Sequence, residues 1–257
     1  MSQVSRSARP RIPKSEFEQR VQRVQEHMER LDLDLCVIYG DEYRRENLRY
    51  VSNYWPIFER AALVIPASGV PVLLGAPECE KVAREMSAWS DIRVVPDFTC
   101  VTVPETIDYP LAQFTSFSEV FRELSPSTGL RKVGIVGQDA MSFDVFNALK
   151  GALGDAVLVD ANHILHKLRL IKSEAEIACL KTAALIADAA YEALMRACVP
   201  GNTELQAAAA AYQAAHSEGA EAVPFIVFGS GSRSDSIVGR PTEKVLELGD
   251  MVMAALA

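Results

Sequence analysis

The feature that most constrains this chain is an alternation of short apolar runs and amphipathic stretches between residues 17 and 160. Apolar residues recur at intervals of three and four from Phe17 to Leu31, which predicts a helix. The following apolar run, 34–40, ends on a glycine and predicts a buried strand. Further strands are expected at 61–66, 70–74, 92–95, 132–137 and 156–160, and helices at about 79–89, 111–124 and 142–149. This alternation predicts an α/β fold with a mixed sheet flanked by helices.

The region after residue 162 has a different pattern and begins with two long helices. Ser173 and Glu176 form a capping box, in which the hydroxyl and the carboxylate each bind a free amide at the helix start. Thr203 and Gln206 form a second capping box, and the second helix is expected to end at Gly219. The first helix carries a repeat at intervals of three and four: Ile177, Leu180, Ala184, Ala187, Tyr191, Leu194 and Cys198.

Apolar runs after the second helix predict two strands, at 225–228 and 248–257, joined by a loop. We therefore expect an α+β arrangement in this part of the chain. The expected organisation of the whole chain is a loose basic arm at 1–12, an α/β domain at 13–161 and a second region at 162–257.

Composition excludes several classes of function. The net charge is −8 with acids and bases interspersed, which argues against binding nucleic acid through its phosphates. No uncharged apolar run is long enough to span a membrane. The five cysteines include no CxxC pair, so we expect buried free thiols in a reducing cytoplasm. The polar start, 1–14, lacks the apolar core of a secretory signal; a short mitochondrial-type presequence is the alternative.

Several motifs in order along the chain carry a family resemblance. The run Leu168–Ile177 is similar to an "LR-x-IKS-x-x-E-I" pattern, and Asn47–Tyr54 is similar to "N-I-x-Y-L-T-G-Y". Two further stretches match, Gly201–Leu205 with 219–231, and Arg240–Met253. Together they resemble the creatinase, prolidase and aminopeptidase P family. The resemblance implies a creatinase/prolidase-type N-terminal domain followed by the first, incomplete part of a pita-bread (M24-type) domain.

The resemblance also implies a metal site that these residues depart from. Members of the family often bind two divalent ions (Mn, Co or Zn) through two Asp, one His and two Glu. In their "GD-L-V-x-x-D-x-G" pattern the first Asp falls on Ala255, and the later ligands are expected beyond Ala257. The family histidine that assists proton transfer falls on Val238. An alanine methyl cannot bind a metal ion, so we expect no metal or other cofactor in this chain.

Candidate substrate-binding residues follow from family position. The loop 229–236 is rich in glycine and hydroxyls, and could hold an anion through Ser232, Arg233 and its backbone amides, or could be a plain connector. Arg240 could bind a substrate carboxylate or form a surface ion pair with Glu243 or Asp250. Phe228 precedes this loop. Trp55 belongs to an aromatic group with Tyr54 and Phe58 that could line a pocket or belong to the core.

Histidines offer one further hypothesis. His163 and His166 are three residues apart, the spacing of one helical face, and Asp160 is close to them in the sequence. They could form a metal pair, but a pair of solvated or packing side chains in a linker helix is the stronger interpretation.

The resemblance implies a hydrolase, acting on a C–N bond of a small substrate or peptide, without the usual dinuclear metal site. The alternative is a catalytically inactive binding or assembly protein of the same fold. We expect this chain to be inactive alone, to form a homodimer as relatives do, and to be cytoplasmic. A natural product of this length would expose its terminal strand as an apolar edge.

Overall fold

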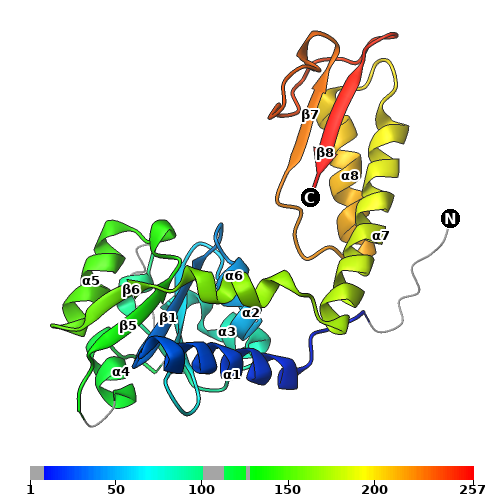
Figure 1. Cartoon of the computed structure of the whole chain (residues 1–257). Coiled ribbons are helices and arrows are strands. Elements are labelled where there is room, and N and C mark those ends of the chain that lie inside the picture. Colours follow the sequence, from blue (N-terminus) through cyan, green and yellow to red (C-terminus); the bar gives the residue numbers. More distant parts are fainter. Residues whose placement is uncertain (1–8, 101–112, 126–127) are drawn as a thin grey trace. The chain divides into compact units, whose positions relative to one another are not determined.

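The structure is a computed structural model that describes residues 9–100, 113–125 and 128–257 (Figure 1). It divides into an N-terminal unit, Pro13–Lys172, and a C-terminal unit, Ser173–Ala257 with the described residues 9–12. Each unit has a hydrophobic core of its own. Within the described residues, no helix has both the length and the apolar character needed to cross a membrane.

The N-terminal unit contains α1 (Lys14–Leu31), β1 (Leu35–Asp41), α2 (Glu46–Ser52), β2 (Arg60–Pro66), β3 (Val72–Gly75), η1 (Pro77–Cys79), α3 (Glu80–Met86), β4 (Ile92–Val94), η2 (Pro96–Phe98), α4 (Phe117–Leu124), β5 (Lys132–Val136), η3 (Gln138–Ala140), α5 (Phe143–Leu153), β6 (Val157–Asp160) and α6 (Asn162–Leu170). Its strands form one sheet in the order β4-β3-β2-β1-β5-β6. β1 pairs antiparallel with β2 and parallel with β5. The predicted mixed sheet is therefore confirmed.

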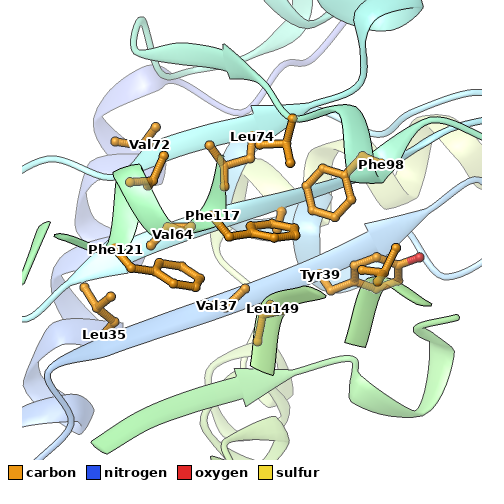
Figure 2. Packing of buried hydrophobic residues seen from close by; sticks show 14 of the residues in the cluster. Leu35, Val37, Tyr39, Val64, Val72, Leu74, Phe98, Phe117, Phe121 and Leu149 are labelled. Atoms are coloured by element: carbon orange, nitrogen blue, oxygen red, sulfur yellow. The ribbon is translucent and has the colours of Figure 1, made fainter. Parts of the chain in front are cut away.

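One face of this sheet carries the largest part of the core (Figure 2). Leu35, Val37 and Tyr39 alternate along β1 toward this face, because successive side chains of a strand point to opposite sides. Helices α4 and α5 cover the face with buried apolar side chains. The ring of Phe98 packs edge-on against Phe117, with 5.2 Å between the ring centroids. Phe98 also packs against Tyr39 of β1, with 6.3 Å between the ring centroids, so these rings connect η2 and α4 to the central strand.

The opposite face is covered by α1, α2 and α6, which contact one another and the sheet. Two glycines in strands make this packing possible. A Cβ on Gly40 would lie 2.7 Å from Cβ of Leu48 in α2, and a Cβ on Gly134 would lie 3.0 Å from Cβ of Ala161 at the start of α6. Because both faces are covered, β1 is buried almost throughout, which explains its unbroken apolar run.

Predicted element boundaries differ from the structure in several places, including the terminal strand, which was expected at 248–257 and is limited to β8 at Val252–Leu256. The helix expected at about 79–89 consists of η1 and α3 and ends at Met86. The helix expected from residue 111 begins at Phe117, where Ser116 and Glu119 form a capping box; residues 111–112 lie outside the described residues. The helix α5 extends to Leu153 rather than 149. The linker helix α6 belongs by its contacts to the N-terminal unit.

The C-terminal unit contains α7 (Glu174–Ala197), α8 (Glu204–Glu218), β7 (Ile226–Ser230), η4 (Gly231–Arg233) and β8 (Val252–Leu256). Both predicted capping boxes are present, and α8 ends at Gly219 in the left-handed conformation. β7 and β8 pair antiparallel, and α8 lies between this hairpin and α7 (Figure 1). The guanidinium of Arg9 donates to the carbonyls of Glu218 and Gly219, at the helix end where carbonyls lack partners within the helix.

The alanine run of α8 has a packing function. Ala207, Ala208 and Ala211 are buried in the core that α8 shares with α7 and with the hairpin side chains Phe228 and Ile226. Alanine favours the helix and leaves room for the strands to approach closely. The alanine run therefore forms the α8 part of this core.

The cysteines only partly follow the prediction of buried free thiols. Cys36, Cys100 and Cys198 are free, and the thiol of Cys179 donates to the carbonyl of Pro10 over 3.6 Å. Cys36 is buried, and burial raises the pKa of its thiol to about 12. Cys179 and Cys198 are half-buried, whereas Cys100 is exposed, so burial was wrong for that residue. Cys100 follows the short helix η2 at a point where the chain leaves the core.

We predict that Phe98→Ala lowers the free energy of unfolding of the N-terminal unit by about 3–5 kcal/mol, because it leaves a cavity between the sheet and α4. Both tryptophans, Trp55 and Trp89, lie in this unit, so tryptophan fluorescence during urea unfolding reports on it alone. The control is Phe143→Ala on α5, whose side chain is 77% exposed and whose loss should change little. Equal effects of the two substitutions would contradict the packing described.

Candidate functional site

A buried carboxylate organises the C-terminal unit. Glu204, at the first turn of α8, is 0% exposed. Its Oε1 accepts hydrogen bonds from the backbone N–H (2.9 Å) and hydroxyl (2.7 Å) of Ser230 at the end of β7. Its Oε2 accepts from the backbone N–H (2.9 Å) and hydroxyl (2.7 Å) of Thr242. The carboxylate thus joins three segments that lie far apart in the sequence.

The charge of Glu204 is stabilised by these donors. Burial alone would raise the pKa of Glu204, but the hydroxyls of Thr242 and Ser230 and then their backbone N–H groups favour the ionised form, so the pKa lies below its ordinary value. The Nε atom of Arg233 lies 3.4 Å from Oε1 and adds a cation. A carboxylate with both oxygens occupied and a lowered pKa is suited to anchoring rather than to transferring protons.

The loop that follows β7 is folded back on itself and held at several points. The Nη2 of Arg233 donates to the carbonyl of Arg240 over 2.8 Å. The backbone N–H of Phe228 donates to the carbonyl of Gly239 over 3.0 Å. A Cβ on Gly229 would lie 2.4 Å from the carbonyl oxygen of Arg233, so only glycine allows this close approach. The loop is therefore a fixed platform.

A second ion pair joins Lys244 and Asp250, on the segment that follows this loop. The Nζ of Lys244 lies 2.5 Å from Oδ2 of Asp250, which also accepts from the backbone N–H of Glu247. The bond from Lys244 is the main cause that lowers the pKa of the Asp250 carboxyl. Asp250 is thus committed to Lys244 and does not form the ion pair with Arg240 that the sequence left open.

The predicted substrate-binding residues are distributed over both units. Ser232, Arg233 and Arg240 lie together in the loop; the first and last are exposed, and Arg233 is half-buried. Phe228 is 0% exposed and faces α8 as part of the core. Trp55 belongs to the N-terminal unit, where the guanidinium carbon of Arg49 lies 3.9 Å from its ring centroid. The structure therefore brings three of the five predicted residues together.

Ala255, on which the sequence pattern places the family's first metal-binding Asp, lies on the hairpin face that points away from α8. Ala255 pairs with Val227, and Met253 pairs with Gly229. Since Phe228 and Ala254 face the core, alternation along the strands places Ala255 and its three neighbours on the opposite face. These side chains offer no oxygen or nitrogen to a hard or borderline cation, so they do not fit the first half of a dinuclear site.

The other suggested ligands are also not assembled. Val238 is 79% exposed in the loop and cannot transfer a proton. His163 and His166 are exposed on α6, and Oδ1 of Asp160 accepts from the backbone N–H of Asn162. In the described part of the chain, no three His, Cys, Asp or Glu side chains form a group that could hold a metal ion.

Glu204 is the residue that sequence reasoning missed. In the sequence it appears only as a member of the run Gly201–Leu205, because its partners Ser230 and Thr242 are 26 and 38 residues away. A usable signal was present. An acidic residue at the first turn of a helix, directly after the capping Thr203, is placed where free N–H groups favour negative charge.

Comparison with known proteins gives the following matches. Residues 20–171 match the family profile of the Creatinase/Prolidase N-terminal domain, and residues 178–257 match that of Metallopeptidase family M24. The "Probable dipeptidase PepE" of Mycobacterium tuberculosis is 30% identical over 221 residues, 86% of this chain and 51% of the relative. The "Uncharacterized peptidase YqhT" of Bacillus subtilis is 34% identical over 127 residues, 49% of this chain and 36% of the relative. The chain thus spans about half the length of these relatives or less.

Solved structures give a consistent result. The dipeptidase PepE of Mycobacterium ulcerans superposes with a TM-score of 0.69 and 26% identity, covering 96% of this chain and 61% of that structure. The prolidase of Pyrococcus horikoshii OT3 has a TM-score of 0.72 at 24% identity, covering 93% and 60%, a likeness that shows the fold alone.

We predict that Glu204→Gln destabilises the C-terminal unit at neutral pH, because one amide cannot accept the hydrogen bonds of both Ser230 and Thr242. The expected loss is on the order of 2 kcal/mol. Since the folded-state pKa of Glu204 is lowered, its contribution is complete above the pKa of an unfolded glutamate and is lost as the pH falls through the folded pKa. The difference between wild type and variant should therefore shrink steadily below about pH 4.3.

The measurement is urea unfolding followed by far-ultraviolet circular dichroism, because α7 and α8 dominate the helix content of this unit. The control is Glu243→Gln in the same segment, whose side chain is exposed and which should show almost no difference at any pH. A difference for Glu204→Gln that stays constant from pH 7 to pH 3 would show that the ionised form is not the stabilising one.

Proposed function

This chain belongs to the creatinase, prolidase and aminopeptidase P family, as its motifs predicted, and we propose that the protein hydrolyses a C–N bond in a small substrate or peptide without the family's dinuclear metal site. The observation that carries the proposal is the apolar outer face of the β7–β8 hairpin. Ala255, on which the sequence pattern places the first metal-binding Asp, lies there beside Val227 and Met253. No catalytic acid or base is assigned to these residues.

The loop after β7 supplies substrate recognition in this proposal. Arg240 presents its exposed guanidinium from a loop that Arg233 and Glu204 hold in place. A guanidinium offers two parallel donors to a carboxylate, which suits the free carboxyl end of a dipeptide. Ser232 is the nearby hydroxyl donor. The role of Arg233 is to position the loop. Its guanidinium donates to the backbone carbonyl of Arg240 and lies beside the carboxylate of Glu204.

The second candidate is a catalytically inactive binding or assembly protein. The same observations favour it: the loop and its arginines are intact, whereas Val238 and Ala255 replace the two side chains on which the family's chemistry depends. In either case we propose a homodimer in the cytoplasm. The buried, free thiol of Cys36 supports a reducing compartment.

We predict that any hydrolysis of Xaa-Pro dipeptides by the protein isolated from its native source survives dialysis against EDTA. Mass spectrometry of the metal content should give fewer than two metal ions per chain. Activity that EDTA abolishes and Mn²⁺ restores would overturn the metal-independent proposal. Saturable dipeptide binding without any hydrolysis would favour the binding protein instead.

We predict that Arg240→Gln weakens dipeptide binding roughly 10–100-fold, the range expected when a charge-assisted hydrogen bond to a carboxylate is lost. The measurement is calorimetric titration with an Xaa-Pro dipeptide. A dipeptide amide, which lacks the carboxylate, should bind wild type and variant equally. The matched control is Arg196→Gln, an exposed arginine on α7 that pairs with Glu192. Equal affinity of wild type and Arg240→Gln for the free dipeptide would contradict the assignment.

A further inference from the structure

Residues 9–12 precede the N-terminal unit in the sequence but pack on the C-terminal unit. The chain leaves this segment at Pro13, forms the N-terminal unit, and returns to the C-terminal unit at Ser173. The chain therefore connects the two units twice, at Ile12–Pro13 and at Lys172–Ser173. The first connection is anchored in the C-terminal unit only as long as segment 9–12 stays bound to it.

Arg9 anchors this segment at the end of α8. Its Nη1 donates to the carbonyl of Gly219 and its Nη2 donates to the carbonyl of Glu218, each over 3.2 Å. The carbonyls at a helix end have no partner within the helix, and the helix dipole there favours a cation. A guanidinium offers several donors in one plane, so a single arginine binds both carbonyls.

Gly219 makes room for this guanidinium. Its φ of 97° is left-handed, which is the conformation that ends α8. A Cβ at this position would overlap the guanidinium of Arg9. Glycine is thus required here for two reasons, the helix end and the bound arginine. A side chain at residue 219 should therefore displace Arg9.

Pro10 forms the second contact of the segment, with α7. The thiol of Cys179 donates to the carbonyl of Pro10 over 3.6 Å. Helices α7 and α8 lie side by side and are joined by residues 198–203 (Figure 1). At 1.5 Å per residue, Cys179 and Gly219 lie about 27 Å and about 22 Å along the helices from that connection. Segment 9–12 therefore bridges the two helices at their open end.

The contact is small and is prepared by the sequence of the segment. Pro10 and Pro13 each hold φ at about −65° whether or not the segment is bound, which reduces the entropy lost on binding. The printed hydrogen bonds of Arg9 are exposed to solvent, and Pro10 is half-buried. A surface contact of a few hydrogen bonds opens locally while the helices beneath it stay folded.

We propose that segment 9–12 is a detachable strap. When bound, it clamps the open end of the α7–α8 pair and shields the thiol of Cys179. When released, it exposes that thiol and leaves the units connected through Lys172–Ser173. Because the strap and a group attached to Cys179 need the same space, each weakens the binding of the other. The strap is separate from the loop that carries Arg240 and does not depend on the proposed function.

Thiol labelling of the full 257-residue chain tests the shielding. The chain is treated with iodoacetamide in native buffer, and labelled peptides are measured by mass spectrometry. Arg9→Ala should raise the labelling rate of Cys179 about fivefold or more, because the two hydrogen bonds of a charged donor are lost. The matched control is Arg11→Ala, which removes the same charge from an exposed side chain of the same segment and should leave the rate unchanged.

Cys198 provides an internal control in every sample. It is half-buried like Cys179 but lies at the other end of α7. Release of the strap should change the labelling of Cys179 alone, whereas general destabilisation of the unit should raise the labelling of both thiols. Equal rates at Cys179 in wild type and Arg9→Ala, or equal increases at Cys179 and Cys198, would overturn the proposal.

Gly219→Ala should release the strap by a second route, because its Cβ takes the place of the guanidinium. It also strains the helix end, so circular dichroism checks that α8 is still folded. If this substitution acts through Arg9, its effect on Cys179 labelling should be about threefold or more smaller in the Arg9→Ala background than in wild type. Equal effects in the two backgrounds would contradict this role of Gly219.

Trypsin tests the competition from the side of the strap. The bond Arg11–Ile12 is a trypsin site within the segment, whereas Pro10 protects the bond after Arg9. Cleavage requires the segment to leave the helices, so blocking Cys179 with N-ethylmaleimide should release the peptide that ends at Arg11 several-fold faster.

The control for this measurement is Cys179→Ser treated with the same reagent. Its other cysteines still react, so it should be cleaved after Arg11 at the rate of untreated wild type. Treated wild type that is cleaved no faster than untreated wild type would show that the thiol and the strap do not compete.

Discussion

The carboxylate of Glu204 is the interaction on which the C-terminal unit depends. A charge that is 0% exposed is tolerated only where donors replace its lost water, and Ser230 and Thr242 together provide four. Each donor pair comes from a different segment, so the requirement to satisfy one charge fixes where β7 ends relative to the start of α8. The loop between Ser230 and Thr242 is therefore closed at both ends by the same side chain.

The residues that fix the loop after β7 are different from the residues that the loop exposes to a ligand. Glu204 accepts hydrogen bonds from Ser230 and Thr242, Arg233 contacts Glu204, and Asp250 pairs with Lys244. These side chains therefore hold the loop in place and are not available to bind a metal ion or transfer a proton. The exposed side chains of this loop include Arg240 and Ser232, which can donate hydrogen bonds to an anion. Beside them lies a hairpin face of alanine, valine, glycine and methionine. In the proposed function this unit holds a substrate group in place, while the outer face of its hairpin offers no oxygen or nitrogen ligand from its side chains.

Local signals in the sequence predicted the elements well, because capping boxes and glycine ends act over a few residues. Ser173 with Glu176 and Thr203 with Gln206 start α7 and α8 as expected. The candidate site was harder to predict. Its central residue acts through partners that only the fold brings near, and Phe228, predicted in the pocket, faces the core because of strand alternation. The repeat along α7 predicted the helix correctly, but of its seven residues only Leu194 is fully buried, because the side of α7 that packs on α8 is centred on Ala190 and Leu194.

The two helices of the C-terminal unit differ in the size of the side chains that they bury. Helix α8 uses alanines, so the hairpin lies close to its axis, and the buried area comes from the larger Phe228 and Ile226. Helix α7 packs on α8 through Ala190 and Leu194 and keeps its larger side chains, Ile177, Leu180 and Tyr191, on the outside. Large apolar side chains contribute most when buried, so a helix that leaves them exposed along one line gains stability only when another surface covers that line.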